Sequence, residues 1–97
     1  MYYIEDKKIK LSNPKKFGLS SRAVLGQYSN NNWVLIKDRK SRVIMKDGRQ
    51  ILEQIQIIKN KEPKTKVSLA TNAPVCGKTT KFLKERGIEI LYLKKTN

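Results

Sequence analysis

The residues of this sequence that are best suited to chemistry are the cations between residues 37 and 49, where basic side chains outnumber acidic ones. They are Lys37, Arg39, Lys40, Arg42, Lys46 and Arg49, beside Asp38 and Asp47. An Arg guanidinium donates hydrogen bonds as a planar fork and a Lys ammonium is a compact charge, so both suit phosphate oxygens. The segment therefore predicts contact with the phosphate backbone of a nucleic acid. The simpler alternative is a solvated turn in a Lys-rich chain.

A second candidate lies at residues 71–80, where Gly77-Lys78-Thr79 is similar to the end of a Walker A phosphate loop. That pattern needs a glycine where Asn72 stands, and Pro74 removes a backbone N–H from the loop. We therefore do not expect an NTP-hydrolysing site. A weaker expectation is that Lys78 and free N–H groups at a helix start hold one backbone phosphate.

The single cysteine, Cys76, excludes an internal disulfide and a multi-cysteine zinc site. Residues 66–93 resemble the first strand–helix–strand unit of a glutaredoxin, with the cysteine near the helix start. A thiol in that position can have a lowered pKa. Thr79 stands where the second cysteine of a C-x-x-C pair would be, so a small buried cysteine is the favoured interpretation.

Among the aromatic residues, Trp33 is the best candidate for stacking on an unpaired base, because it opens an expected strand beside three asparagines. The alternative is that it builds the core, which a chain this short needs its large side chains to do.

The elements that must position these residues follow from hydrophobic spacing and turn signals. Strands are expected at 2–11, 33–37, 43–45, 67–71 and 88–93, and helices from residue 14, over 49–61 and from 72–74. Phe17, Leu19, Val24 and Leu25 are expected to face the core from the first, short helix. Residues 38–41 would join two strands as a hairpin, and both strands would be covered on two faces.

This order, roughly β-α-β-β-α-β-α-β, predicts an α/β or α+β fold with one mixed sheet, as a single basic domain over residues 1–97. The final strand–helix–strand unit favours a parallel pair of strands. Gly87 is expected to end the last helix, with Ile88 packing back on its last turn.

The order of elements over residues 14–86 also resembles a minimal restriction-endonuclease-like core, as in the Mrr-type enzymes. That family places an Asp on one central strand and Glu-x-Lys on the next. Asp38 and Lys46 would match, with Ile44 in place of the Glu and Asp47 or Glu53 as substitutes. The resemblance implies a metal-dependent nuclease with Mg²⁺ as cofactor; the departure at Ile44 puts metal binding in question.

The composition of the chain excludes several classes of function. The 97 residues carry 22 Lys and Arg against 8 Asp and Glu, a formal charge of +14, and no histidine, which removes His-based triads and His-containing zinc sites. No apolar run is long enough to span a bilayer, and residues 1–6 do not look like a signal peptide, so a cytoplasmic location is expected. Lysine enrichment from a hot habitat usually comes with glutamate, which is scarce here.

The leading hypothesis is a small, non-catalytic domain that binds DNA or RNA through phosphate contacts with weak sequence selectivity and without a cofactor. Its predicted contacts are the six cations of residues 37–49, Lys78 and Trp33. The alternatives are the nuclease, using Asp38 and Lys46, and an interaction protein for an acidic protein partner. Self-association stays open.

Overall fold

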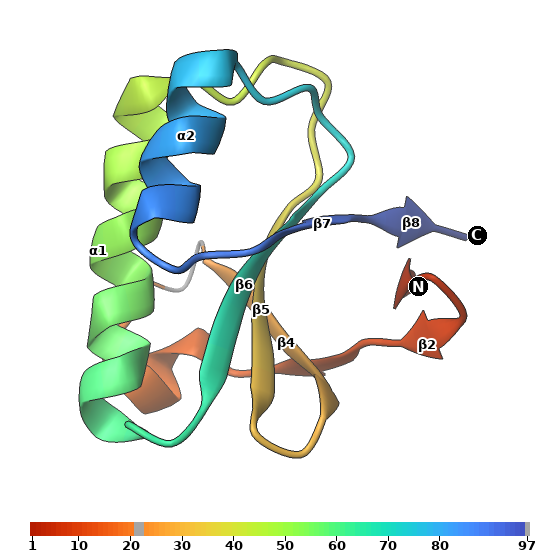
Figure 1. The fold of residues 1–97 in the computed structure, drawn as a ribbon. Coiled ribbons are helices and arrows are strands. Elements are labelled where there is room, and N and C mark those ends of the chain that lie inside the picture. The colour runs from red at the N-terminus through yellow and green to blue at the C-terminus, as the bar shows by residue number, and fades with distance from the viewer. Residues whose placement is uncertain (21–22, 97) are drawn as a thin grey trace.

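The structure, a computed structural model, describes residues 1–20 and 23–96. Its elements form three layers: two helices, a central five-stranded sheet and a small three-stranded sheet (Figure 1). The α+β class and the mixed sheet are therefore as predicted, with the small sheet as an addition.

The central sheet has the strand order β3-β4-β5-β6-β7. Its strands are β3 (Lys10–Ser12), β4 (Val24–Ser29), β5 (Asn32–Lys37), β6 (Lys66–Thr71) and β7 (Ile90–Tyr92). Neighbours among β3, β4 and β5 run antiparallel, whereas β5, β6 and β7 are parallel. The parallel pair of β6 and β7 around a helix confirms the prediction for the end of the chain.

Alternating side chains of β5 divide the core into two clusters. Trp33 and Leu35 pack in the cluster beneath the helices, and Val34 and Ile36 pack in the cluster beneath the small sheet. Strand β5 is thus covered on both faces, as its unbroken apolar run predicts. The same alternation fixes where the polar residues at the end of β5 point.

The small sheet joins the two ends of the chain. Strand β1 (Tyr2–Ile4) pairs with β2 (Lys7–Lys8) on one side and with β8 (Lys94–Lys95) on the other. The N-terminal ammonium also donates to the carbonyl oxygen of Thr96 at 2.8 Å, which places the termini side by side (Figure 1). The strand expected over residues 2–11 is therefore three short strands, broken first at Glu5, whose φ is 56°.

The two helices are α1 (Met45–Lys61) and α2 (Gly77–Glu85). Helix α1 buries Ile51, Ile55 and Ile58, the spacing from which it was predicted. Gly87, with φ of 74°, follows α2, and the Ile88 N–H donates to the Leu83 carbonyl at 3.0 Å, which confirms the predicted helix end. Neither helix in the described ranges is long and apolar enough to cross a membrane.

The strand predicted at residues 43–45 and the hairpin predicted before it are both wrong. Residues 43–45 do not form a strand, because Val43 makes an isolated bridge to Val75 and Met45 already begins α1. Residues 37–49 are consequently a loop and a helix start, and not a hairpin. The antiparallel partner of β5 is β4, joined to it through a turn at Asn31, whose φ is 66°.

The short helix expected after residue 14 is only a 3₁₀ turn, η1 (Pro14–Phe17), which Asn13 caps and Gly18 ends. Phe17 and Leu19 are buried as expected, but Val24 and Leu25 lie in β4. Gly18 adopts a φ of 80°, a left-handed conformation that stops the turn. Ser21 and Arg22 lie outside the described residues.

Candidate nucleic-acid interface

Two loops meet where the parallel strands β5 and β6 end. The Val43 N–H donates to the Pro74 carbonyl at 2.8 Å, and the Cys76 N–H donates to the Val43 carbonyl at 3.0 Å. These bonds join residues 38–44 to residues 72–76, just before the first turns of α1 and α2. We call residues 38–49 and 72–80 together the strand-end surface.

Asp38 anchors this surface to the small sheet. Its carboxylate accepts from the Asn72 side-chain amide at 2.9 Å and from the Tyr2 hydroxyl at 2.9 Å, and it pairs with the Lys95 ammonium at 3.1 Å. These bonds, led by that from Asn72, hold the pKa of Asp38 below its ordinary value. The carboxylate is therefore a structural anchor, turned away from the helices.

Arg39 is a clamp within the loop and not a free cation. Its guanidinium pairs with the Asp47 carboxylate at 2.5 Å and donates to the backbone carbonyls of Ser41 and Arg42. Asp47 also accepts from the Ile44 N–H at 2.9 Å, which satisfies a donor at the start of α1. The Arg39 hydrogen bond is the main reason why the pKa of Asp47 is lowered. The expectation that Arg39 is free to contact phosphate is thus corrected.

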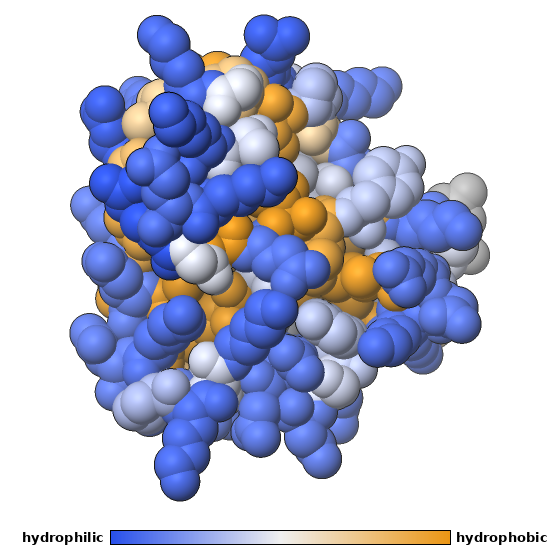
Figure 2. Space-filling model, viewed as in Figure 1, coloured by the Kyte–Doolittle hydropathy of each residue, from blue (hydrophilic) through white to orange (hydrophobic). Residues whose placement is uncertain are grey.

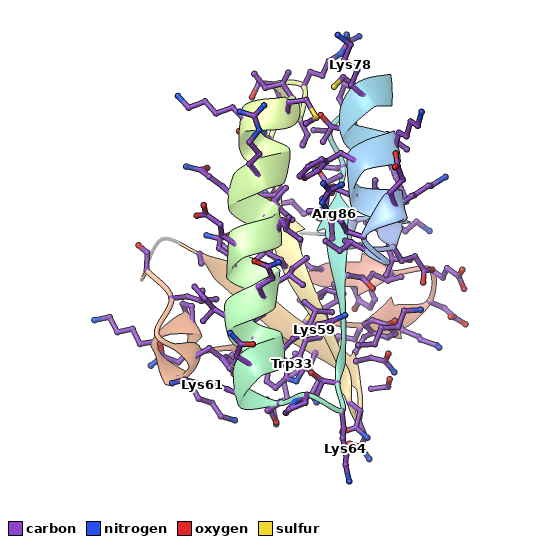
Figure 3. All side chains as sticks on the ribbon, turned by 60° about the vertical axis from the view of Figure 1, so that its left-hand side comes forward. Trp33, Lys59, Lys61, Lys64, Lys78 and Arg86 are labelled. Carbon is purple, nitrogen blue, oxygen red and sulfur yellow. The ribbon has the colours of Figure 1, made fainter. Side chains whose placement is uncertain are left out.

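The other cations of the surface point into solvent. Lys40, Arg42, Lys46, Arg49 and Lys78 are all exposed, and none of them belongs to an ion pair among residues 1–20 and 23–96. They lie in the first loop and the first turns of the two helices, so they share one end of the molecule; Figure 3 shows Lys78 at that end. The structure therefore unites the two basic segments that the sequence offered separately.

Cys76 lies within this surface as the N-terminal cap of α2. Its sulfur is 2.8 Å from the Thr79 hydroxyl oxygen, and this hydrogen bond is the main cause of a lowered thiol pKa, with a smaller contribution from the charge of Arg42. The side chain is partly exposed, whereas a buried cysteine was favoured from the sequence. Thr79 is fully buried, so its hydroxyl is not available to a nucleotide-bound metal as in a Walker A loop.

Lys37 is separated from these cations. It follows Leu35 on the helix-facing side of β5, and it lines a pocket of about 420 Å³ with Ser20, Ala23 and three α1 side chains, Gln50, Glu53 and Gln54. Burial, reinforced by the charge of Arg39, lowers its pKa. Its predicted role on an exposed basic face does not match this placement.

Trp33 lies in the core and does not offer a free face to a base. Only 4% of it is exposed, and its ring meets Phe17 edge-to-face with the centroids 5.1 Å apart. The Lys16 ammonium covers it from another side, 5.6 Å from the ring centroid. The prediction that Trp33 binds nucleic acid is therefore corrected in favour of its structural alternative.

The structure also changes which residues stand at the positions of the nuclease motif. Asp38 and Lys46 do not lie on adjacent strands, because no strand forms at 43–45. On the actual central hairpin, a Glu-x-Lys pattern would end at Lys37, and Leu35, fully buried, stands where the Glu would be. Glu53 is the acidic side chain that lines the Lys37 pocket. Within the described residues there is no group of three or more potential metal ligands.

Comparison with solved structures finds a similar fold in EndoMS and in a repair endonuclease. The complex of EndoMS with dsDNA matches at a TM-score of 0.71 and 23% identity, covering 97% of this chain and 39% of that chain. EndoMS in its apo form matches at 0.66 and 20%, covering 95% and 38%. A repair endonuclease from Pyrococcus abyssi matches at 0.60 and 16%, covering 75% and 32%. The chain thus spans about two fifths or less of these proteins, and the likeness concerns the fold.

No family model and no curated protein matches the sequence. The likeness to EndoMS and to the repair endonuclease accordingly rests on the arrangement of the helices and strands, and no individual motif residues are carried over from them.

Two cations at the second helix were missed from the sequence. Lys81 on α2 and Arg86, which directly follows α2, line a groove between α1 and α2 together with Lys78 and Arg49. The spacing of three residues between Lys78 and Lys81 is a signal that could have identified Lys81.

Proposed function

We propose that the chain binds DNA through its phosphate backbone, without cutting it, and that the strand-end surface makes the contacts. The observation that carries this proposal is that five exposed cations, which have no carboxylate partner within residues 1–20 and 23–96, gather at the ends of β5 and β6. They are Lys40, Arg42, Lys46, Arg49 and Lys78. The shared fold with EndoMS, which has been solved with dsDNA, supports DNA as the nucleic acid.

The binding mechanism is neutralisation of phosphates and release of their counterions. If all five cations contact phosphates, log affinity for duplex DNA should fall with log salt at a slope of about −4.5, since each contact contributes about −0.9. Lysines outnumber arginines by 17 to 5, which favours contacts with phosphates over bidentate contacts with base edges. Binding is therefore expected to depend weakly on sequence.

The Arg39–Asp47 clamp has a supporting role in this mechanism. It ties the loop to the first turn of α1 and, through the Ser41 and Arg42 carbonyls, fixes the backbone from which Lys40 and Arg42 project. A loop that is already ordered loses less conformational entropy when it binds. Arg39 therefore positions other cations and does not itself contact DNA.

A metal-dependent nuclease fits the residues less well. Cleavage of a phosphodiester by Mg²⁺ relies on carboxylates that hold the ion, and the pocket of Lys37 offers one, Glu53, among the residues described. We expect plasmid DNA to stay intact with Mg²⁺ or Mn²⁺. Metal-dependent cleavage that is lost in Lys37→Ala or Glu53→Ala would overturn the non-catalytic assignment.

Paired charge removals test the interface. Lys40→Ala with Arg42→Ala should reduce the magnitude of the salt slope by about 1.8, which is about 0.9 per lost phosphate contact. The matched control removes two exposed cations of the small sheet, Lys8→Ala with Lys94→Ala, and should leave the slope unchanged. Figure 2 shows hydrophilic side chains spread widely over one face, with hydrophobic residues exposed between them, so this control is needed. Equal losses in both variants would show that binding has no defined surface.

A further inference from the structure

The groove between α1 and α2 has features that an unpaired strand of nucleic acid would use. It has a volume of about 570 Å³ and adjoins the strand-end surface through Lys78. Met45 and Arg49 line it from α1, Lys78, Lys81, Phe82 and Glu85 line it from α2, and Arg86 lines it just after the end of α2. Figure 3 shows Arg86 between the two helices, with Lys78 nearer the loops.

Arg86 is held as a flat platform in this groove. Its guanidinium carbon lies 3.8 Å from the centroid of the Phe82 ring, and its Nη1 donates to the Phe82 carbonyl at 3.0 Å. Phe82 is itself partly buried and packs against the core, so the ring below the guanidinium is fixed. Arg86 is exposed and lines the groove, while the Phe82 ring covers one face of its guanidinium plane.

This arrangement favours a base over a phosphate as the partner of Arg86. One of the groups that would grip a phosphate, Nη1, is already engaged, whereas a planar surface is available. Unpaired bases stack on guanidinium planes, and the bases of a duplex cannot reach such a plane because they are stacked on each other.

The cations beside this platform match a phosphate backbone. Lys78 lies in the first turn of α2 and Arg86 directly follows its last residue, so the groove cations Lys78, Lys81 and Arg86 form a row roughly 12 Å long along the helix axis, at 1.5 Å per residue. Stacked nucleotides place one charge per ~3.4 Å of strand, so this length covers about three phosphates. Arg49 faces the row from α1.

We infer that the α1–α2 groove binds an unpaired strand of nucleic acid, with a base stacked on Arg86 and phosphates on Lys78, Lys81 and Arg49. This inference rests on the proposed function and narrows it to single-stranded substrate at this part of the surface. The stacking plane gives the single strand a contact that a duplex lacks.

The test compares fluorescence anisotropy of the intact protein with a labelled oligothymidylate and with a duplex of the same length. The wild-type chain should bind the single strand more tightly. Arg86→Lys keeps the charge and removes the plane, so it should weaken single-strand binding about tenfold, within the range of a lost stacking contact, without changing duplex binding or the salt slope. Lys81→Ala should reduce the single-strand slope by about 0.7.

Two control variants lie on the same helix. Lys84→Ala removes an exposed cation that does not line the groove and should leave single-strand affinity nearly unchanged. Glu85→Gln removes the negative charge of the groove and should raise affinity about twofold at low salt. Thermal unfolding of each variant checks that the fold is retained.

Three results would overturn the inference. If single strand and duplex bind equally and Arg86→Lys changes neither, the groove inference fails while DNA binding stands. If polyglutamate competes as well as the oligonucleotide, the surface suits an acidic protein. If neither nucleic acid binds, the proposed function itself fails.

Discussion

Replacing Gly48 by alanine should destabilise the protein, although alanine is the better helix former. A Cβ atom at Gly48 would lie 2.8 Å from the Cγ2 methyl of Thr79, where α1 and α2 pack together. Thr79 is fully buried and is bonded to Cys76, so its methyl has little room to move. One of the helices must therefore shift, and the strand-end surface is built on the first turns of both.

The expected size follows from two opposing effects. Alanine in place of glycine inside a helix gains about 1 kcal/mol, and overpacking a tight contact costs about 1–3 kcal/mol. Gly48→Ala should therefore lower the free energy of unfolding by about 1 kcal/mol, measured by urea denaturation. For a domain of this size, the melting temperature should fall by about 4–8 °C.

A second substitution at the contact isolates the cause. Thr79→Ser removes the methyl and keeps the hydroxyl, at a cost of about 1 kcal/mol for the buried group. In this background Gly48→Ala should stabilise the protein by about 1 kcal/mol, because only the helix gain remains. If the effects of the two substitutions on the free energy of unfolding simply add, or if Gly48→Ala by itself stabilises the protein, this account of the helix contact is refuted.

Other consequences follow from the same geometry. The pKa of Asp47 lies below its ordinary value of 3.8, chiefly because of the hydrogen bond from Arg39. The ionised Asp47 carboxylate therefore stabilises the folded state fully above pH 3.8, and this stabilisation is lost as the pH falls through the folded-state pKa. Urea unfolding at a series of pH values should therefore show a smaller loss on acidification in Asp47→Asn than in the wild type; equal losses would contradict the clamp. Because Trp33 is buried, its fluorescence should not change when DNA saturates the protein, and strong quenching would show that a base reaches it. Arg39→Met should weaken DNA binding through disorder of its loop, which amide hydrogen exchange at Lys40 and Ser41 would detect as faster exchange; unchanged exchange would rule out a positioning role.

The elements that could be predicted from sequence are those with strong local patterns. The apolar run of β5, the helical spacing of Ile51, Ile55 and Ile58, and the glycine that ends α2 each report on their immediate neighbourhood. Hydrophobic periodicity of this kind survives folding because it determines which side chains are buried.

Residues 43–45 could not be assigned in this way. Val43, Ile44 and Met45 are too short a run to distinguish a strand from a helix start, and Asp47-Gly48 has the form of a turn signal. The structure of this segment depends on a residue that is distant in the sequence, because Val43 forms an isolated β-bridge with Val75. The predicted hairpin and the predicted position of the nuclease motif both depend on a strand at 43–45, and both are wrong because that strand does not form.

The candidate site was foreseen in its residue types more than in its arrangement. Excess positive charge at residues 37–49 and at Lys78 is visible in the sequence, and five of these cations are exposed. Arg39 is bound by the carboxylate of Asp47, eight residues away, because of how the loop folds. Lys37 faces a pocket because of the direction of its strand. Neither is encoded in local spacing.

The salt dependence of binding to duplex DNA tests the central claim most directly, because it counts phosphate contacts. For the intact chain we predict a log–log slope of about −4.5, which weakens to about −2.7 when Lys40 and Arg42 are both replaced by alanine. An affinity that does not respond to salt, or a slope that the double variant leaves unchanged, would contradict binding through the strand-end surface.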